Sequence, residues 1–329
     1  MSGIKALLVL PRLRVQNANA ISSPLTWGFP SITAFIGLMQ ALERKLPEHI
    51  DLIFERVGVI CHDFEAQVTA GGYTRAFHLT RNPVGRDGGT AAIVEEGRVH
   101  LELTLVFDVT GMACEEGPEG QVEVAREIAD IVAGMRIAGG SVMPTLPGHA
   151  KARQDAELIL LDEDTEQRDR QFRQLRRRWL PGFALVCRDD LLRGRLAELQ
   201  KTDPGATALD AWLELSRLNI VPTNAESAKK SGKIADNVRW DVRRATGWLV
   251  PIPVGYGALS PLYQPGEIAN ARDTVTPFRF VESLYSIGQW ISPHRLNGPD
   301  DMLWYTDTDS KAGLYRCRND YRPLTTAQE

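Results

Sequence analysis

Arginine and amide side chains alternate with small or apolar residues over positions 11–20, which read PRLRVQNANA. The polar members of this segment are Arg12, Arg14, Gln16, Asn17 and Asn19, and Ser22, Ser23 and Trp27 follow them. Proteins bind single-stranded RNA with cations at the phosphates, amides at base edges and aromatic rings stacked on bases. The segment is therefore a candidate RNA-binding surface. The alternative is a solvated strand end that leads into a capped helix.

A second polar segment runs from Phe77 to Arg98 and contains Arg81, Asn82 and Arg86. Its arginines and small residues surround Asn82-Pro83-Val84-Gly85-Arg86-Asp87-Gly88-Gly89, a sequence rich in turn-forming residues. We expect a protruding arm here whose arginines reach a nucleic acid. An ordinary solvated hairpin is the alternative.

Motifs for catalysis, metal binding or cofactor binding are missing. The sequence holds no GxxxxGK[ST], HExxH, GxSxG or EF-hand pattern. Gly255 and Gly257 are followed by Ser260 and Pro261, which does not fit a dinucleotide fingerprint. The four cysteines are far apart, without a CxxC pair, so we expect reduced, mostly buried thiols. We therefore predict no metal and no cofactor.

Histidine and cysteine residues offer one alternative chemistry. Cys61 and His62 are adjacent on a predicted strand, so their side chains point to opposite faces and cannot pair as nucleophile and base. His78 and His100 flank the arm and are the candidates for general acid or base in an RNA-cleaving enzyme. Half-exposed strand residues are the simpler interpretation of both.

Composition and charge restrict the class of protein. With 329 residues, 43% of them hydrophobic and 24% charged, the chain is an ordinary globular protein and not a disordered, collagen-like or disulfide-scaffold one. A net charge of −4 argues against affinity that rests on overall positive charge. Charge is segregated, however, because residues 1–42 hold three basic residues and no acid. We expect a cytoplasmic protein, since the apolar segment 247–263 is broken by three prolines and residues 4–10 are too short for a signal peptide.

Hydrophobic periodicity predicts the elements that carry the first segment and the arm. In chain order we expect a strand at 6–10, a helix from the N-cap Ser31 to before Pro47, strands at 52–60 and 64–68, a strand at 101–107 with one buried face, a helix at 121–137 and a strand at 156–161. This order is that of the split ferredoxin-like fold, which RNA-recognition domains also use. The arm lies between the second and third strands of this order.

The rest of the chain predicts an insert and a C-terminal part. Residues 166–220 have a helical pattern with an arginine-rich face and core-like residues, and 222–235 resemble a mobile loop. A strand at 248–252, a helix near 278–290 and a hairpin at 303–316 follow. We therefore divide the chain into a ferredoxin-like core at 1–165 with a thumb arm near 72–98, a helical insert and loop at 166–240, and C-terminal strands, a Gly/Pro loop and a hairpin at 241–329 that complete the domain.

The apolar segment 247–263 carries more aromatic surface than such a core can cover. It contains Trp248, Tyr256 and Tyr263 among its prolines and glycines. Surplus aromatic surface is typical of an interface with a partner. The alternative is that the helical insert covers this segment.

Several blocks of sequence closely resemble one known family over nearly the whole chain. They are residues 16–30 (QNANAISSPLTWGFP), 79–83 (LTRNP), 90–98 (TAAIVEEGR), 247–253 (GWLVPIP), 258–263 (ALSPLY), 270–273 (NARD) and 292–295 (SPHR). They are similar to the Csy-two family, the Cas-five-type (RAMP superfamily) subunits of the type I-F (Csy) CRISPR surveillance complex. The chain departs from the family blocks around 112–120 and 222–235.

This resemblance implies a fold and a function. The fold is α+β, with a ferredoxin-like or RNA-recognition-motif-like core, a β-hairpin thumb and a helical insert. The function is that of a non-catalytic subunit that binds the 5′ handle of the guide crRNA, for antiviral DNA targeting. The implied partners are the crRNA, the large Cas-eight-type subunit as a heterodimer, the adjacent backbone subunit, and target DNA through the assembled complex, with no membrane.

The resemblance also assigns residues to the RNA. Arg12, Arg14, Gln16, Asn17 and Asn19 become candidates for handle contacts, with Trp27 as the stacking ring. Arg81, Asn82 and Arg86 are candidates on the thumb. Arg98, Asn270 and Arg272 are candidates for RNA or large-subunit contacts. Two alternatives stay open: a metal-independent RNA-processing nuclease of the Cas-five type, and a pure protein scaffold.

Overall fold

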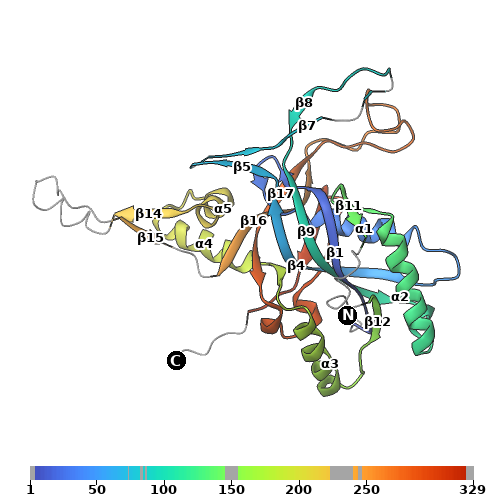
Figure 1. Cartoon of the computed structure of the whole chain (residues 1–329). Coiled ribbons are helices and arrows are strands. Elements are labelled where there is room, and N and C mark those ends of the chain that lie inside the picture. Colours follow the sequence, from blue (N-terminus) through green and yellow to red (C-terminus); the bar gives the residue numbers. More distant parts are fainter. Residues whose placement is uncertain are drawn as a thin grey trace, which may run out of the picture.

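The computed structural model describes residues 4–72, 74–81, 84–85, 87–144, 155–222, 240–243 and 247–323. Within them the chain is of the predicted α+β class. Eleven strands form one large sheet in which every neighbouring pair is antiparallel, and helices lie against it (Figure 1). None of the described helices is both long and apolar enough to cross a membrane.

The first half of the chain has the predicted order of elements. It consists of β1 (Ala6–Asn19), α1 (Ile32–Glu43), β4 (Ile53–Ala66), β9 (Arg98–Thr110), α2 (Pro118–Ala133) and β12 (Glu157–Leu160). In the sheet these strands are ordered β12–β1–β9–β4. The strands expected at 52–60 and 64–68 are one continuous strand, β4, with a register shift between Cys61 and Asp63.

Two pairs of short strands follow β1 and α2, and the second pair joins the large sheet. After β1 come β2 (Ile21–Ser23) and β3 (Thr26–Trp27), which pair with each other. After α2, β10 (Arg136–Ile137) and β11 (Gly140–Met143) form a hairpin, and β11 pairs with β1. The helix predicted at 121–137 therefore ends earlier than expected, because Ile137 belongs to β10.

Helices α1 and α2 cover one face of the sheet. The hydroxyl of Ser31 accepts a hydrogen bond from the Thr33 N–H and caps α1, as predicted. Pro118 begins α2, where its missing N–H costs nothing. The inner faces of both helices pack into a single core with β1, β4 and β9. The predicted apolar periodicity of these helices is confirmed by their buried residues Ile32, Phe35, Ile36, Leu38, Met39, Leu42, Val124, Ala125, Ile128 and Val132.

The opposite face is covered by α3 (Thr165–Arg178), which Asp164 caps. Phe172, Leu175 and Trp179 pack there against Val9 and Val106 of the sheet. The prediction that β9 has one buried face is therefore wrong beyond Leu103, since Thr104, Val106 and Asp108 are also buried.

The C-terminal strands return the sheet to β4. They are β13 (Phe183–Cys187), β16 (Trp248–Ala258), β17 (Val281–Ile291), β18 (Leu303–Asp309) and β19 (Leu314–Asn319). The pairing path β4–β13–β17–β16–β19–β18 ends on β4 again, because β13 pairs at Ile60 and Cys61 and β18 pairs at Val57 and Gly58. A Cβ on Gly58 would lie 3.3 Å from Met302 Cγ, so glycine lets β18 approach β4 closely.

Two predictions for this half are wrong. The segment near 278–290 is the strand β17 and not a helix, because β13 and β16 offer it backbone partners on both sides. The segment 166–220, expected to be helical throughout, contains β13 between α3 and the pair α4 (Asp189–Thr202) and α5 (Ala208–Ser216). The hairpin at 303–316 is confirmed by β18 and β19.

The insert packs less tightly than its apolar pattern suggests. Helix α4 has no fully buried side chain, although Leu191, Leu192 and Leu196 were expected in a core. On α5, Trp212 is buried and donates a hydrogen bond from Nε1 to the Ser286 carbonyl, while Leu209 and Leu213 are exposed.

Three ribbons project from the body (Figure 1). Between β4 and β9 the chain forms β5 (Val68–Gly71) with β6 (Thr74–Phe77), and β7 (Leu79–Arg81) with β8 (Ile93–Glu95). At the left of the picture β14 (Asn219–Pro222) pairs with β15 (Trp240–Arg243). The mobile loop predicted at 222–235 lies outside the described residues except for Pro222.

Candidate nucleic-acid interface

Two β-bulges interrupt the pairing of β1 with β9, between Leu10 and Leu13 and between Val15 and Ala18. Each contains a residue with a left-handed backbone, Arg12 at φ 53° and Asn17 at φ 58°. Asparagine adopts this region more readily than arginine does. A bulge removes a backbone N–H from the strand ladder, so this group needs another acceptor.

Side chains of β9 supply both acceptors. The Arg12 N–H donates to Thr104 Oγ1 at 3.2 Å, and the Asn17 N–H donates to His100 Nδ1 at 3.1 Å. The bulges are therefore fixed by residues on the neighbouring strand. These contacts hold the intervening part of β1 in one conformation.

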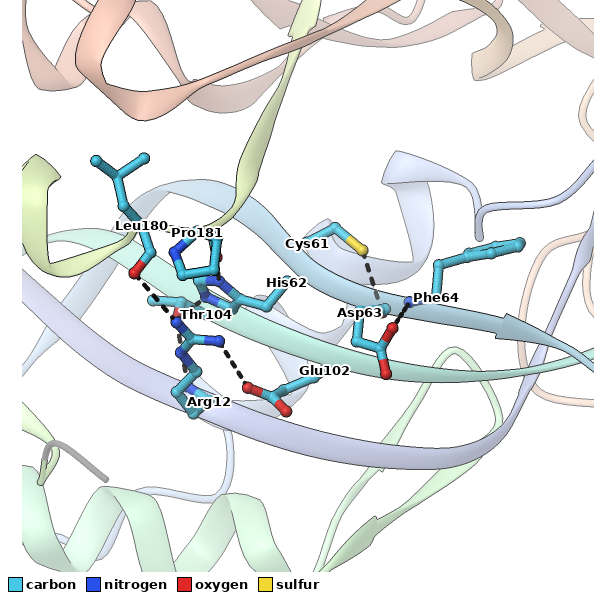
Figure 2. A network of polar contacts seen from close by, with 9 residues as sticks. All are labelled: Arg12, Cys61, His62, Asp63, Phe64, Glu102, Thr104, Leu180 and Pro181. Carbon is cyan, nitrogen blue, oxygen red and sulfur yellow. Dashed lines mark hydrogen bonds and ion pairs between the residues drawn. The ribbon is translucent and has the colours of Figure 1, made fainter. Parts of the chain in front are cut away.

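Thr104, which is buried, is also part of a chain of hydrogen bonds that runs through His62 to Pro181 (Figure 2). His62 Nε2 lies 2.7 Å from Thr104 Oγ1, and His62 Nδ1 lies 2.7 Å from the Pro181 carbonyl. Because a carbonyl only accepts, Nδ1 carries the proton, and the Thr104 hydroxyl donates to Nε2. Burial lowers the pKa of His62, which favours this neutral ring.

The charge of Arg12 is already engaged within the chain. Its Nη1 lies 2.8 Å from Glu102 Oε1, and its Nη2 donates to the Leu180 carbonyl at 3.4 Å (Figure 2). Arg12 thus joins β1 to β9 and to the turn after α3. A phosphate at this position would compete with Glu102.

Arg14 lies between the two bulges and Gln16 lies in the second bulge, and both side chains are exposed. Within the described part of the chain, no hydrogen bond or ion pair engages either side chain. Asn17 and Asn19 continue the exposed row, although Asn19 also holds the turn to β2, with its Nδ2 donating to the Ile21 carbonyl at 2.9 Å. We call Arg14, Gln16, Asn17 and Asn19 the β1 row.

Trp27 stands beside the end of this row. Its ring centroid lies 5.9 Å from that of Phe77 at the end of β6, and 41% of the residue is exposed. A Cβ on Gly97 would lie 3.2 Å from Trp27 Nε1, so a glycine leaves room for the indole. An exposed ring face next to amides is suited to stacking on a base.

The arm carries fewer free cations than the sequence suggested. Arg81 is exposed on β7, with no ion pair among the described residues. Arg98 binds Glu96 at 2.6 Å, and this hydrogen bond keeps the pKa of the Glu96 carboxyl below its usual value. Asn82 and Arg86 lie outside the described residues.

Asn270 and Arg272 lie in the exposed loop between β16 and β17. Asn270 has a left-handed backbone at φ 60°, and a bridge between Tyr263 and Phe278 closes the loop. Among the described contacts, none joins this loop to the β1 row.

The histidines and cysteines do not form a described catalytic pair. His62 has both ring nitrogens engaged, and His100 uses Nδ1 to hold the second bulge. Burial raises the pKa of the Cys61 thiol to about 12, which opposes its use as a nucleophile. Over the described residues, no group of His, Cys, Asp and Glu has the arrangement of a metal site.

Sequence reasoning missed the supporting residues of the site. Glu102 and Thr104 were seen only as the polar face of an alternating strand, and Phe77 only as the start of the arm. These roles could not be found from the local sequence, because each depends on a contact with a residue far away in the chain. Thr104 and Glu102 contact Arg12 of β1, and Phe77 contacts Trp27 of β3.

Comparisons with known proteins agree on one family. A family model described as "CRISPR-associated protein (Cas_Csy2)" matches residues 8–317. The chain is also 51% identical over 314 residues to "CRISPR-associated protein Csy2" of Pseudomonas aeruginosa (strain UCBPP-PA14), which covers 95% of this chain and 94% of that protein.

Proposed function

Because the chain belongs to the Csy2 family of CRISPR-associated proteins, we propose that it is a non-catalytic RNA-binding subunit of the type I-F Csy complex. Its role is to hold the 5′ handle of the guide crRNA for antiviral DNA targeting. The large Cas-eight-type subunit and the first backbone subunit are the proposed protein partners, in the cytoplasm.

The β1 row is the observation that carries this proposal. It presents one guanidinium and three amides in a strand segment fixed by two bulges, with the Trp27 ring beside it. A rigid row of this kind loses little conformational entropy on binding a flexible strand. The guanidinium suits a phosphate and the amides suit base edges.

The architecture supports the same assignment. The order β12–β1–β9–β4, with α1 after β1 and α2 after β9, is the strand order of a ferredoxin-like or RNA-recognition core. The two ribbons between β4 and β9 stand where a thumb would leave such a core. Arg81, and with it Asn82 and Arg86, are the proposed thumb contacts, and Arg98, Asn270 and Arg272 are proposed as peripheral ones.

RNA binding by the full chain tests the proposal. A single-stranded RNA with the handle sequence is titrated at several salt concentrations against the wild type, Arg14→Ala, Arg81→Ala and the double variant. Each lost phosphate contact should flatten the slope of log K against log salt by about 0.7. Arg173→Ala is the matched control, since Arg173 is exposed on α3, away from the row, and should change nothing.

A slope that is unchanged in the double variant would contradict the proposed contacts. The same preparations are incubated with a handle-containing precursor RNA. We expect no specific cleavage, with or without a divalent metal. Cleavage that disappears in His78→Ala or His100→Ala would instead support the nuclease alternative.

A further inference from the structure

A hollow of about 430 Å³ opens where β4, β13, β16 and β17 meet the loop after β3. Its floor is formed by Leu185, Ile252 and Trp290, which are buried and belong to the main core. The hollow is therefore built on the main core. We call it the aromatic pocket.

Four large aromatic residues stand around its mouth without being covered. Trp27, Phe64 and Phe183 are each 41% exposed, and Trp248 is 56% exposed. The rings of Phe183 and Trp248 meet edge to face with centroids 5.2 Å apart. Aromatic surface that gathers around a preformed hollow is typical of a binding site for an anchoring side chain.

The helical insert does not cover this mouth. Trp212 of α5 packs beside Tyr285, with its Nε1 donating to the Ser286 carbonyl on β17. In the sheet, Ser286 lies opposite Ile252, four residues beyond Trp248. Within segment 247–263, Trp248 therefore has the exposed aromatic surface that the sequence predicted.

The charge around the pocket selects the class of occupant. Asp63 is exposed at the mouth, where its Oδ1 accepts the Phe64 N–H, and it forms no ion pair within the described part of the chain. The described lining contains no lysine or arginine, and burial lowers the pKa of His62, which favours its neutral form. A mouth with an acidic residue and no cation repels the negatively charged phosphate of a nucleotide. It attracts a lysine or arginine that stands next to an apolar residue in a peptide.

We propose that the aromatic pocket docks one bulky apolar side chain of a protein partner, with lysine or arginine beside it in the partner's sequence. The cationic neighbour meets Asp63 while the apolar group fills the space over Trp290 and Ile252. This docking is separate from RNA binding by the β1 row. Trp27 borders both surfaces.

Nuclear magnetic resonance of the full chain, labelled with ¹⁵N, tests the proposal. The probes are acetyl-Lys-Trp-Lys-amide, acetyl-Glu-Trp-Glu-amide and a trinucleotide of uridine. The indole N–H signals of Trp27 and Trp248 should shift with the lysine peptide. Those of Trp212 and Trp304 should not, because their N–H groups donate to backbone carbonyls in the interior. We expect the lysine peptide to bind about tenfold more tightly than the glutamate peptide.

Two variants separate the charge from the cavity. Asp63→Asn should reduce the preference for the lysine peptide by about threefold, while Glu65→Gln, two residues along β4, should leave it unchanged. Val250→Phe places extra volume in the lining and should abolish binding of every peptide with the unfolding midpoint maintained. If that variant does not fold, the Asp63→Asn result still decides.

Three results would overturn the proposal. One is equal binding of the two peptides. Another is a shift of Trp248 that is larger with the trinucleotide than with the lysine peptide, which would make the pocket a nucleobase site. The last is a shift of the Trp212 and Trp304 indole signals as large as that of Trp248, which would indicate that the peptide does not bind at the pocket.

Discussion

Thr104 has two partners in the network at the first bulge. Its hydroxyl, which is itself buried, accepts from the Arg12 N–H and donates to His62 Nε2, and both of these partners are half-buried. A hydroxyl can do both, and the side chain of valine, which has nearly the same shape, can do neither. The left-handed backbone of Arg12 depends on this contact together with the pairing to Glu102.

Replacing Thr104 by Val should destabilise the chain, although the two side chains have nearly the same shape. The change leaves the half-buried Arg12 N–H and His62 Nε2 without these partners, at a cost of about 1 kcal/mol or more. Urea unfolding measures this loss. Thr306→Val, at an exposed position of β18, is the control and should change stability by less than about 0.5 kcal/mol. Equal effects of the two substitutions would show that the hydroxyl of Thr104 is not needed.

Asp108 gives the chain a pH dependence of the opposite sign to that of most acids. Its carboxylate is 3.0 Å from Arg56 Nε, yet burial raises its pKa to about 6, because only 5% of the side chain is exposed. The folded state then binds the proton more tightly than the unfolded state, whose pKa is near 4. The contribution of Asp108 to stability is therefore full below about pH 4 and declines as the pH rises through 6.

Asp108→Asn should remove this decline. Between pH 4 and pH 6 the free energy of unfolding of the wild type should fall relative to the variant, by at most about 1.4 kcal/mol per pH unit. Urea titrations over this range measure the difference. Parallel curves for the two proteins would mean that Asp108 does not titrate there.

At the scale of elements, glycines decide how closely strands approach. Gly255 lies at the register shift between β16 and β17, with φ 154°, and a Cβ there would lie 2.0 Å from the Tyr315 carbonyl oxygen. Gly37 lies in α1, where a Cβ would have open space around it, with nothing within 4 Å. The same substitution should therefore have opposite effects at the two sites.

Gly255→Ala should destabilise the chain by several kcal/mol, on the order of the larger core substitutions, since it forces β19 away from β16. Gly37→Ala should stabilise it by about 0.5–1 kcal/mol, through better helix propensity. Thermal unfolding of the two variants measures both changes. Destabilisation by Gly37→Ala would contradict the expectation that a methyl group fits beside α1 without a clash.

Local patterns predicted the elements whose partners lie nearby in sequence or whose burial is one-sided. The Ser31 cap, the apolar stripe of α1 and the β18–β19 hairpin are of this kind. The strand β17 was mistaken for a helix because its sequence, VESLYSIGQWI, contains apolar residues at both strand and helix spacing. Its backbone partners come from β13 and β16, and only the assembled sheet selects between the two periods.

The candidate site shows the same division. Composition was enough to single out Arg14, Gln16 and Trp27, which are exposed, although the strand predicted to end at residue 10 continues to Asn19 and carries the first two. That Arg12 and Arg98 are paired with Glu102 and Glu96 could not be read from the arginines alone. Neither bulge is visible in the sequence, because a bulge is a property of two strands.

At the scale of the whole molecule, the pairing path that returns to β4 occupies the middle of this long strand on both edges. β4 is paired with β9 along one edge, and with β18 at Val57 and Gly58 and with β13 at Ile60 and Cys61 along the other, so its middle offers no open edge to another chain. The projecting ribbons offer a partner another kind of surface. The ribbon β14–β15 is suited to this, since Leu218, Ile220, Trp240 and Val242 are all exposed on or next to it.

We therefore predict that the isolated chain is poorly behaved and gains stability from the large Cas-eight-type subunit. A partner that binds only the folded chain, at a concentration 100 times its dissociation constant, adds about 2.7 kcal/mol. For a chain of 329 residues this raises the unfolding midpoint by roughly 4 °C, given about 2.1 cal/mol/K of unfolding entropy per residue. Differential scanning fluorimetry, with the labelled chain alone and mixed with the purified partner, measures the rise.

The ribbon supplies the control for this experiment. Ile220 and Val242 face each other across β14 and β15, and both are exposed, so changing both to Thr preserves the strand preference while removing apolar surface. The double variant should keep the midpoint of the isolated chain, because these side chains contribute little to the core. It should lose most of the rise in unfolding midpoint on adding the partner, because the apolar surface it lacks is the surface that association buries.

A wild-type midpoint that does not move with the partner would show that the chain is not stabilised by this pairing. A full rise in the double variant would place the contact elsewhere, with the exposed aromatic residues of β16 next in order, since Trp248 and Tyr256 keep 56% and 40% of their surface.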